Sequence, residues 1–323
     1  MAIQSLNGKA FEYACLISLA SLLEKRTVNI NIQINDNEPA LITARTDFNS
    51  LTEVQQNDMI LAAEAGMSEV IRYEPRLYDN SSVLRMFLQT DANGIRGDVR
   101  DVVCQKESEN WQIGISCKNN HHAVKHSRLS PTIDFGLMWM DNPVSEEYWI
   151  ETENIWKYLS EIVQNRPGTL WRNIDQNKEE FIYKPLLSAF SKELNKICKD
   201  QKNTTKLFEY LLGSYDFYKV IANKSIRSTE VMAFNMYNTL NKSLYIKPER
   251  RLRQTQLPNR LYEIAPVIRN NKLSNNTIEV AFNDWAVRFR IHNASSRVEK
   301  SLKFDINLQS VPATLQNNIV PWQ

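Results

Sequence analysis

Alternating apolar and polar residues predict a β-hairpin in the first third of the chain. In the run 111–118, every second residue belongs to one face of a strand. The apolar face consists of Trp111, Ile113, Ile115 and Cys117, and the polar face of Gln112, Gly114, Ser116 and Lys118. Residues 97–104 are expected to form the partner strand, and the polar residues 107–110 suit a reversal between strands. If the hairpin is symmetric about its middle, Asp101 lies opposite Lys118, about 5 Å away at Cβ.

Apolar residues at helical spacing predict a helix over residues 6–26. Glu12 begins a stripe that continues with Leu16, Leu19 and Leu23, although a carboxylate is rarely buried without a partner. Either Glu12 lies near the helix start and stays hydrated, or it faces a cation. The pattern supports both alternatives equally.

The rest of the chain predicts a mixed α/β fold. We expect a strand at 27–34, then a capping box at 50–53 that opens a helix reaching about residue 71, with Glu64 and Glu69 solvated on it. Helical patterns follow at 148–199, broken at 166–168, and at 206–212. A strand is expected at 214–221, and then a β-rich region with strands at 243–246, 261–268, 277–282, 286–291 and 302–308 and a turn at 274–276.

Composition narrows the class of protein. The 323 residues are 42% hydrophobic and 24% charged, as is typical of a soluble globular protein. With only 8 glycines, the chain contains no glycine-rich phosphate-binding pattern. The cysteines Cys15, Cys104, Cys117 and Cys198 are scattered, three of them within apolar patterns, which favours buried thiols over disulfides or a zinc site. The sequence shows neither a signal peptide nor an apolar run long enough to span a membrane, so we expect an intracellular protein.

Charge is distributed unevenly. Residues 240–305 contain 13 Lys and Arg against 6 Asp and Glu, whereas the net charge of the whole chain is only +2. Such a basic segment suits a surface that faces a polyanion. A basic face that is merely solvated would have the same composition, and charge alone does not separate the two.

Three histidines, His121, His122 and His126, occur within six residues. The spacing of the last two would suit a metal site on a helix, but no suitably spaced carboxylate or further cysteine follows to complete a zinc site. A basic segment that includes Lys125 and donates hydrogen bonds to phosphate is the better interpretation.

Several stretches resemble the PD-(D/E)xK nuclease superfamily, and more closely the HaeIII-type restriction endonucleases. They are residues 8–12, 97–103, 115–120 with the histidines that follow, 216–221, and 289–299 continuing to 304–305. Because they span nearly the whole chain, the resemblance is more specific than any one motif. It implies a nuclease core with a central mixed sheet flanked by helices, a helical insertion and a β-rich C-terminal region. The expected divisions are a nuclease core at 1–145, a mainly helical region at 146–224 and a basic, DNA-recognising region at 225–323.

The resemblance also implies catalytic residues. The superfamily has an aspartate at the start of a central strand and D/E-x-K on the next strand, which Asp101 and Lys118 match. Ser116 stands at the middle acidic position, so a second carboxylate would come from elsewhere, either Glu12 or Asp98. Mg²⁺ would be held by Asp101, that second carboxylate and the backbone carbonyl of Cys117. Lys118 would orient or deprotonate the attacking water and stabilise the developing charge.

By the same resemblance, the chain is expected to be a cytoplasmic, prokaryotic type II enzyme that cuts double-stranded DNA within GGCC. It would act as a homodimer on the palindrome, or as a monomer that cuts twice, and would be paired with a DNA methyltransferase. The candidate DNA-binding residues are His121, His122, Lys125, Arg250, Arg251, Arg253, Arg288, Arg290, His292, Asn293 and Arg297. Most of them would contact phosphates and a minority would read bases.

Three alternatives remain open from the sequence. Asp101 and Lys118 could form a purely structural cross-strand ion pair. The chain could be a sequence-specific DNA-binding protein without catalysis, or a repair-type nuclease of the same fold without site specificity.

Overall fold

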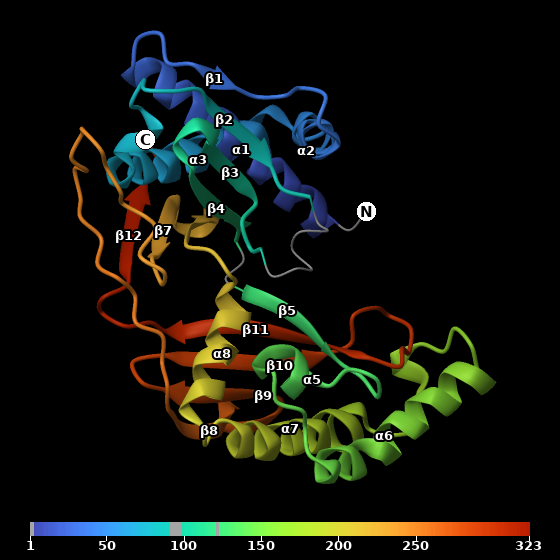
Figure 1. The fold of residues 1–323 in the computed structure, drawn as a ribbon. Helices are drawn as coiled ribbons and strands as arrows, with labels where there is room; N and C mark the ends of the chain where they lie inside the picture. Colours follow the sequence, from blue (N-terminus) through green and yellow to red (C-terminus); the bar gives the residue numbers. More distant parts are fainter. Residues whose placement is uncertain (1–2, 91–97, 121–122) are drawn as a thin grey trace. The chain divides into compact units, whose positions relative to one another are not determined.

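Two compact units, each with its own β-sheet, make up the chain (Figure 1). The computed structural model describes residues 3–90, 98–120 and 123–323. One unit comprises residues 1–122, 213–256 and 313–323, and the other comprises 123–212 and 257–312. These divisions differ from the three consecutive regions expected, because the helices after residue 123 share one core with the late strands. The predicted mixed α/β class is confirmed.

The first unit contains the predicted hairpin within a mixed seven-stranded sheet. Its helices are α1 (Ile3–Arg26), α2 (Pro39–Asn49) and α3 (Glu53–Tyr73). In spatial order, its strands are β1 (Ile32–Gln33), β2 (Leu84–Leu88), β3 (Val102–Lys106), β4 (Trp111–Asn119), β6 (Phe217–Asn223), β7 (Ser228–Phe234) and β12 (Gln316–Pro321). The pairs β1–β2 and β4–β6 are parallel and the other pairs are antiparallel.

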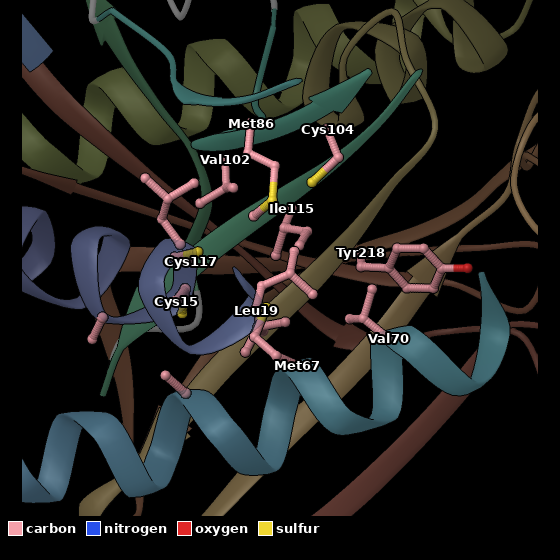
Figure 2. Close-up of a cluster of buried hydrophobic side chains, with 14 of the residues drawn as sticks. Cys15, Leu19, Met67, Val70, Met86, Val102, Cys104, Ile115, Cys117 and Tyr218 are labelled. Atoms are coloured by element: carbon pink, nitrogen blue, oxygen red, sulfur yellow. The ribbon is translucent and has the colours of Figure 1, made fainter. Parts of the chain in front are cut away.

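The apolar side of the hairpin packs against α1, in a buried cluster to which α3 also contributes. Figure 2 shows Cys15 and Leu19 of α1 beside Ile115 and Cys117 of β4, within one buried cluster that also includes Met67 of α3. This packing follows the sequence pattern, because the apolar residues of β4 alternate with polar ones that point to the other face. It also holds the first half of α1, and with it Glu12, against the sheet.

The second unit is an antiparallel five-stranded sheet with helices. Its helices are α5 (Phe135–Met140), α6 (Glu146–Asn165), α7 (Lys184–Ile197) and α8 (Gln201–Leu212). In spatial order, its strands are β5 (Ala123–Leu129), β11 (Leu302–Ser310), β10 (Ala286–His292), β9 (Lys272–Phe282) and β8 (Leu261–Arg269). Phe289 and Phe304 on one face of the sheet pack against Phe190 of α7 and Trp139 of α5. The polar residues that alternate with them lie on the opposite face.

Short helical turns connect these elements. They are 3₁₀ turns at Pro75–Leu77, Glu107–Glu109, Trp171–Asn173 and Lys224–Ile226, and a π-helical turn at Glu179–Tyr183 that leads into α7. No helix in the described part of the chain is both long enough and apolar enough to cross a membrane.

Within residues 27–71, three predictions were wrong in detail. The strand expected at 27–34 is limited to Ile32–Gln33, because Asn29 adopts a left-handed conformation (φ 58°) that interrupts the extended backbone. The capping box belongs to Thr52 and Gln55, whereas Ser50 caps the end of α2, a helix the pattern did not reveal. Glu69 is buried rather than solvated, since it is paired with Arg72 and Arg250.

Two predictions in the C-terminal region were also wrong. Residues 243–246 form a loop instead of a strand, and Leu244 and Tyr245 in it are exposed. An apolar run becomes a strand only where a neighbouring strand takes up its backbone hydrogen bonds. The turn expected at 274–276 lies inside β9. The chain reverses instead at Asn270 and Asn271, both with positive φ, as a tight hairpin turn requires.

Candidate active site

The β3–β4 hairpin has a register two residues away from the symmetric one. Val102 pairs with Ile115 and Lys106 with Trp111, so that Asp101 lies opposite Ser116 and not opposite Lys118. The turn causes the difference: a 3₁₀ turn at Glu107–Glu109 is followed by Asn110 in a left-handed conformation (φ 48°), which places the reversal earlier than the middle of the segment.

Asp101 and Lys118 nevertheless meet. The Lys118 ammonium donates to Oδ2 of Asp101 at 3.0 Å, reaching diagonally across the strands. The same oxygen accepts from the backbone N–H of Cys117 at 2.6 Å and from the Ser116 hydroxyl at 3.2 Å. The side chains of Asp101 and Lys118 remain 20% and 28% exposed. Burial acts to lower the pKa of Lys118, but the charge and hydrogen bond of Asp101 outweigh it and hold that pKa above its usual value.

Glu12 of α1 joins this pair electrostatically. Its residue is only 7% exposed, and its carboxylate pairs with Lys9 three residues earlier at 3.1 Å. Burial, and next the negative charge of Asp101, raises the pKa of Glu12 to about 7. Of the two alternatives left by the sequence, hydration is therefore excluded. Glu12 is a buried acid whose negative form is disfavoured by the neighbouring carboxylate.

Lys219 is the residue of this region that sequence reasoning missed. It lies on β6, where it pairs in register with Ser116 of β4, and it is only 3% exposed. Burial, and next the positive charge of Lys118, lowers the pKa of Lys219 to about 7. The available signal was a lysine in the middle of an apolar strand, a position where charge is costly unless partnered.

Asp98, the other candidate for the second carboxylate, is occupied by protein donors. Arg100 donates to both of its oxygens, at 2.8 and 2.7 Å, and the Gln89 amide donates to Oδ2 at 2.7 Å. The thiol of Cys117 faces the core rather than the pair, and burial holds its pKa well above the usual value. Only the backbone carbonyl of Cys117 is thus available for the role that the resemblance implies.

These residues fit a divalent cation poorly in number but well in charge. Within residues 3–90, 98–120 and 123–323, no three His, Cys, Asp or Glu side chains gather as a metal site. However, burial and next the charge of Asp101 raise the pKa of Glu12, and a cation bound by both carboxylates would offset the burial and relieve their repulsion. Mg²⁺ keeps several waters and needs few protein ligands, so two carboxylates are compatible with it.

Several predicted DNA-binding side chains are engaged within the protein. Arg250 pairs with Glu69 at 3.1 Å, and Arg288 pairs with Glu279 at 3.0 Å. His292 contacts Asp305 at 2.8 Å and the Asn293 carbonyl at 2.9 Å. The Asn293 side chain is bonded to Tyr183, Lys178 and the Ser295 carbonyl.

The remaining described candidates are exposed, apart from the half-buried Lys125. The Lys125 ammonium lies 4.3 Å from the centre of the Tyr210 ring, and burial lowers its pKa. Four arginines are exposed and have no side-chain hydrogen bond or ion pair to any residue that the structure describes: Arg251, Arg253, Arg290 and Arg297. His121 and His122 lie outside the described residues.

Comparison with known proteins identifies the family. The family model described as HaeIII restriction endonuclease matches residues 8–312. The chain belongs to the HaeIII restriction endonuclease family. Across 322 residues it is 37% identical to the type II restriction enzyme HaeIII of Haemophilus aegyptius, with 98% of each chain covered. No solved structure matches the chain.

Membership of the HaeIII family confirms the resemblance and the class of enzyme, a type II site-specific deoxyribonuclease. A restriction endonuclease of this family binds DNA and generally requires a divalent metal ion. Family membership also disfavours the two alternatives for the whole chain, a non-catalytic DNA-binding protein and a repair-type nuclease without site specificity.

Proposed function

We propose that this chain hydrolyses double-stranded DNA at GGCC in a Mg²⁺-dependent reaction, with Asp101, Glu12 and Lys118 as its catalytic centre. The contact between Asp101 and Lys118 beside a buried glutamate is the observation that carries the proposal. A structural ion pair needs no second carboxylate that opposes it, whereas a metal-dependent phosphodiesterase does.

Asp101 and Glu12 would hold the metal ion, together with the backbone carbonyl of Cys117. When bound, Mg²⁺ would neutralise negative charge on the scissile phosphate and lower the pKa of a water molecule. Asp98 is the less suitable ligand, because Arg100 and Gln89 already donate to both of its oxygens. Ser116 would act by holding Oδ2 of Asp101 through its hydroxyl.

Lys118 supplies positive charge to the reacting phosphate. Since Asp101 keeps its pKa above the usual value, Lys118 is protonated near neutral pH. It can therefore orient the attacking water and stabilise negative charge in the transition state, and it is poorly suited to remove a proton. Of the two roles that the resemblance allows, the proposal assigns the electrostatic one.

Recognition of DNA would use side chains that the protein leaves available. We assign Arg251, Arg253, Arg290 and Arg297 as the leading candidates, since guanidinium groups bind both phosphates and guanine edges. Arg250 in the first unit, and Arg288, His292 and Asn293 in the second, would support the available arginines of their own unit, because their polar atoms already have protein partners. A homodimer on the palindrome, a paired methyltransferase and a cytoplasmic site of action complete the proposal.

A plasmid assay tests this function. Unmethylated plasmid incubated with the protein should give discrete fragments with Mg²⁺ and none with EDTA, and sequenced fragment ends should fall within GGCC. Lys118→Ala should slow cleavage by about 100- to 1,000-fold while specific binding persists, because it removes transition-state charge stabilisation. The matched control is Lys192→Ala, an exposed lysine of α7, which should cut normally.

Each other outcome contradicts part of the proposal. A smear in place of fragments would indicate a nuclease without site specificity. Intact plasmid under all conditions would leave DNA binding without catalysis. Normal cutting by Lys118→Ala would remove the hairpin from the mechanism.

A further inference from the structure

Just before Asp101, the Arg100 side chain is held by hydrogen bonds to Asp98. The Asp98 carboxylate accepts four hydrogen bonds: from Nε, Nη2 and the backbone N–H of Arg100 at 2.8, 2.7 and 3.1 Å, and from Gln89 at 2.7 Å. Each of its oxygens therefore already has two donors. A cation that used Asp98 would have to displace one of these donors, and the bidentate guanidinium is a strong partner for a carboxylate.

Arg100 is held from the other side as well. Its residue is only 5% exposed, and its guanidinium carbon lies 3.8 Å from the centre of the Tyr215 ring. Stacking of this kind and a bidentate carboxylate fix the plane of a guanidinium. Few arginines so fully enclosed could reach a DNA phosphate, so a role in direct binding is disfavoured.

The stem of Arg100 lies directly on Gly114. A Cβ atom added at Gly114 would stand 1.9 Å from Cδ and 2.3 Å from Cγ of Arg100. Gly114 is in the interior of β4, where glycine weakens a strand unless another group approaches closely. Here the close approach is that of the arginine stem, and it explains why the polar face of β4 has no side chain at this position.

Arg100 is adjacent to the proposed metal-binding residue. Asp101 follows it directly, and the Asp101 backbone N–H donates to the Ile115 carbonyl at 2.8 Å, next to Gly114. The orientation of Asp101 thus depends on how residues 100 and 101 are seated on β4. A displacement of about 1 Å in a catalytic group is enough to cost about 100-fold in rate.

We propose that Arg100, clamped by Asp98 and Tyr215 and seated on Gly114, is a positioning residue that fixes the Asp101 carboxylate, and that Asp98 is the anchor of this arginine and not a metal ligand. The inference rests on the catalytic role proposed for Asp101. It assigns functions to Arg100, which lies in a stretch that carries the resemblance but was given no role there, and to Gly114 and Tyr215, which lie outside those stretches, and it decides between Glu12 and Asp98.

Magnesium dependence separates an anchor from a ligand. Single-turnover cleavage is measured against Mg²⁺ concentration for Asp98→Asn, Arg100→Met and the double variant, with Glu12→Gln as the ligand control. We expect the first two to lower the maximal rate equally, by about 10- to 100-fold, with the double variant no slower than either. Their half-saturating Mg²⁺ concentrations should stay within about twofold of wild type, whereas that of Glu12→Gln should rise. A tenfold rise for Asp98→Asn but not for Arg100→Met would overturn the inference.

A double-mutant cycle tests whether the contact between the Arg100 stem and Gly114 of β4 matters for cleavage. Gly114→Ala should slow cleavage strongly in the wild-type background, because its methyl group displaces the Arg100 stem, and should have little further effect in an Arg100→Ala background. An equal loss in both backgrounds would show that Gly114 acts independently of Arg100. Thermal unfolding of each variant is recorded alongside. If Gly114→Ala does not fold, folding of the double variant with Arg100→Ala supports the seat, and its failure to fold counts against it.

The Lys118→Ala variant distinguishes failure of this inference from failure of the proposed function. If Lys118→Ala is inactive while Asp98→Asn and Arg100→Met cut at the wild-type rate, only the positioning role fails. If Lys118→Ala itself cuts normally, the catalytic assignment fails whatever the Arg100 variants do.

Discussion

Two lysines of one hairpin, Lys106 and Lys118, each pair with an aspartate, and the pairs differ in how many hydrogen bonds the lysine makes and how exposed it is. At the turn end, the Lys106 ammonium donates to the Asp79 carboxylate at 2.8 Å, the Asp79 carbonyl at 2.7 Å and the Ser81 hydroxyl at 3.3 Å. Lys106 has no exposed side-chain surface. At the open end, Lys118 has Asp101 as its hydrogen-bond partner and keeps 28% of its side chain exposed.

The surroundings sharpen the difference. Around Lys106, the neighbouring charges alternate in sign: Glu109 lies 3.8 Å away and is itself paired with Arg76. Around Lys118, like charges act on each other: the charge of Asp101 adds to the burial that raises the pKa of Glu12, and the charge of Lys118 adds to the burial that lowers the pKa of Lys219. An ion pair whose hydrogen bonds are all made within the protein stabilises the fold. Like charges held close together destabilise it, and a bound substrate or metal ion can relieve that repulsion.

The largest expected effect comes from removing Lys106, the lysine whose hydrogen bonds are all made within the protein. Lys106→Met should lower the free energy of unfolding by about 3–5 kcal/mol, because Asp79 is left as a buried charge without its main partner. Urea unfolding monitored by circular dichroism measures it. Lys118→Met is the matched control and should change stability by less than about 1 kcal/mol, since its pair is partly exposed. Equal losses for the two variants would mean that the pairs do not differ as described.

The next effect is a pH dependence that arises from Glu12. Its pKa is about 7 in the folded chain against a usual 4.5, so the folded state holds a proton that the unfolded chain releases. Stability contributed by the protonated carboxyl is therefore complete below pH 4.5 and is lost as the pH rises through 7. At 1.4 kcal/mol per pH unit, the loss approaches about 3 kcal/mol by pH 8.

Glu12→Gln tests this dependence because glutamine carries no charge at any of these pH values. In EDTA, the free energy of unfolding of the variant should equal that of wild type near pH 4.5 and exceed it increasingly up to pH 8. A difference between the two proteins that does not change with pH would contradict the raised pKa. Glu12→Gln should also need more Mg²⁺ for cleavage, so that a stabilised protein is a poorer enzyme.

How much of this the sequence could predict depends on how local each feature is. The apolar face of β4 and the meeting of Asp101 with Lys118 followed from alternation and sequence distance. The register did not, because it depends on the left-handed Asn110 in the turn. Lys219 stood out as a lysine within an apolar strand, but its place beside Ser116 could not be predicted, since it results from a parallel pairing between strands about 100 residues apart. The saturation of Lys106 likewise depends on Asp79 and Ser81, which precede the hairpin.

The smallest expected effect concerns DNA recognition, where an arginine with a protein partner is compared with one that has none among the described residues. On β10, Arg288 is paired across the sheet with Glu279, while Arg290 is exposed and makes no side-chain hydrogen bond or ion pair within the described residues. Arg290→Ala should weaken binding of a GGCC duplex in EDTA by about 1–3 kcal/mol, and Arg288→Ala by less, because Glu279 already compensates its charge. Fluorescence anisotropy measures both.

A duplex without GGCC then assigns the role of Arg290. If the arginine reads a base, Arg290→Ala weakens binding to the GGCC duplex alone. If it contacts a phosphate, binding to both duplexes weakens and the salt dependence falls by about one charge. A larger effect of Arg288→Ala than of Arg290→Ala would show that an internal ion pair does not prevent an arginine of this sheet from binding DNA. The contrast between saturated and unsaturated charges would then hold for the hairpin and not for the recognition surface.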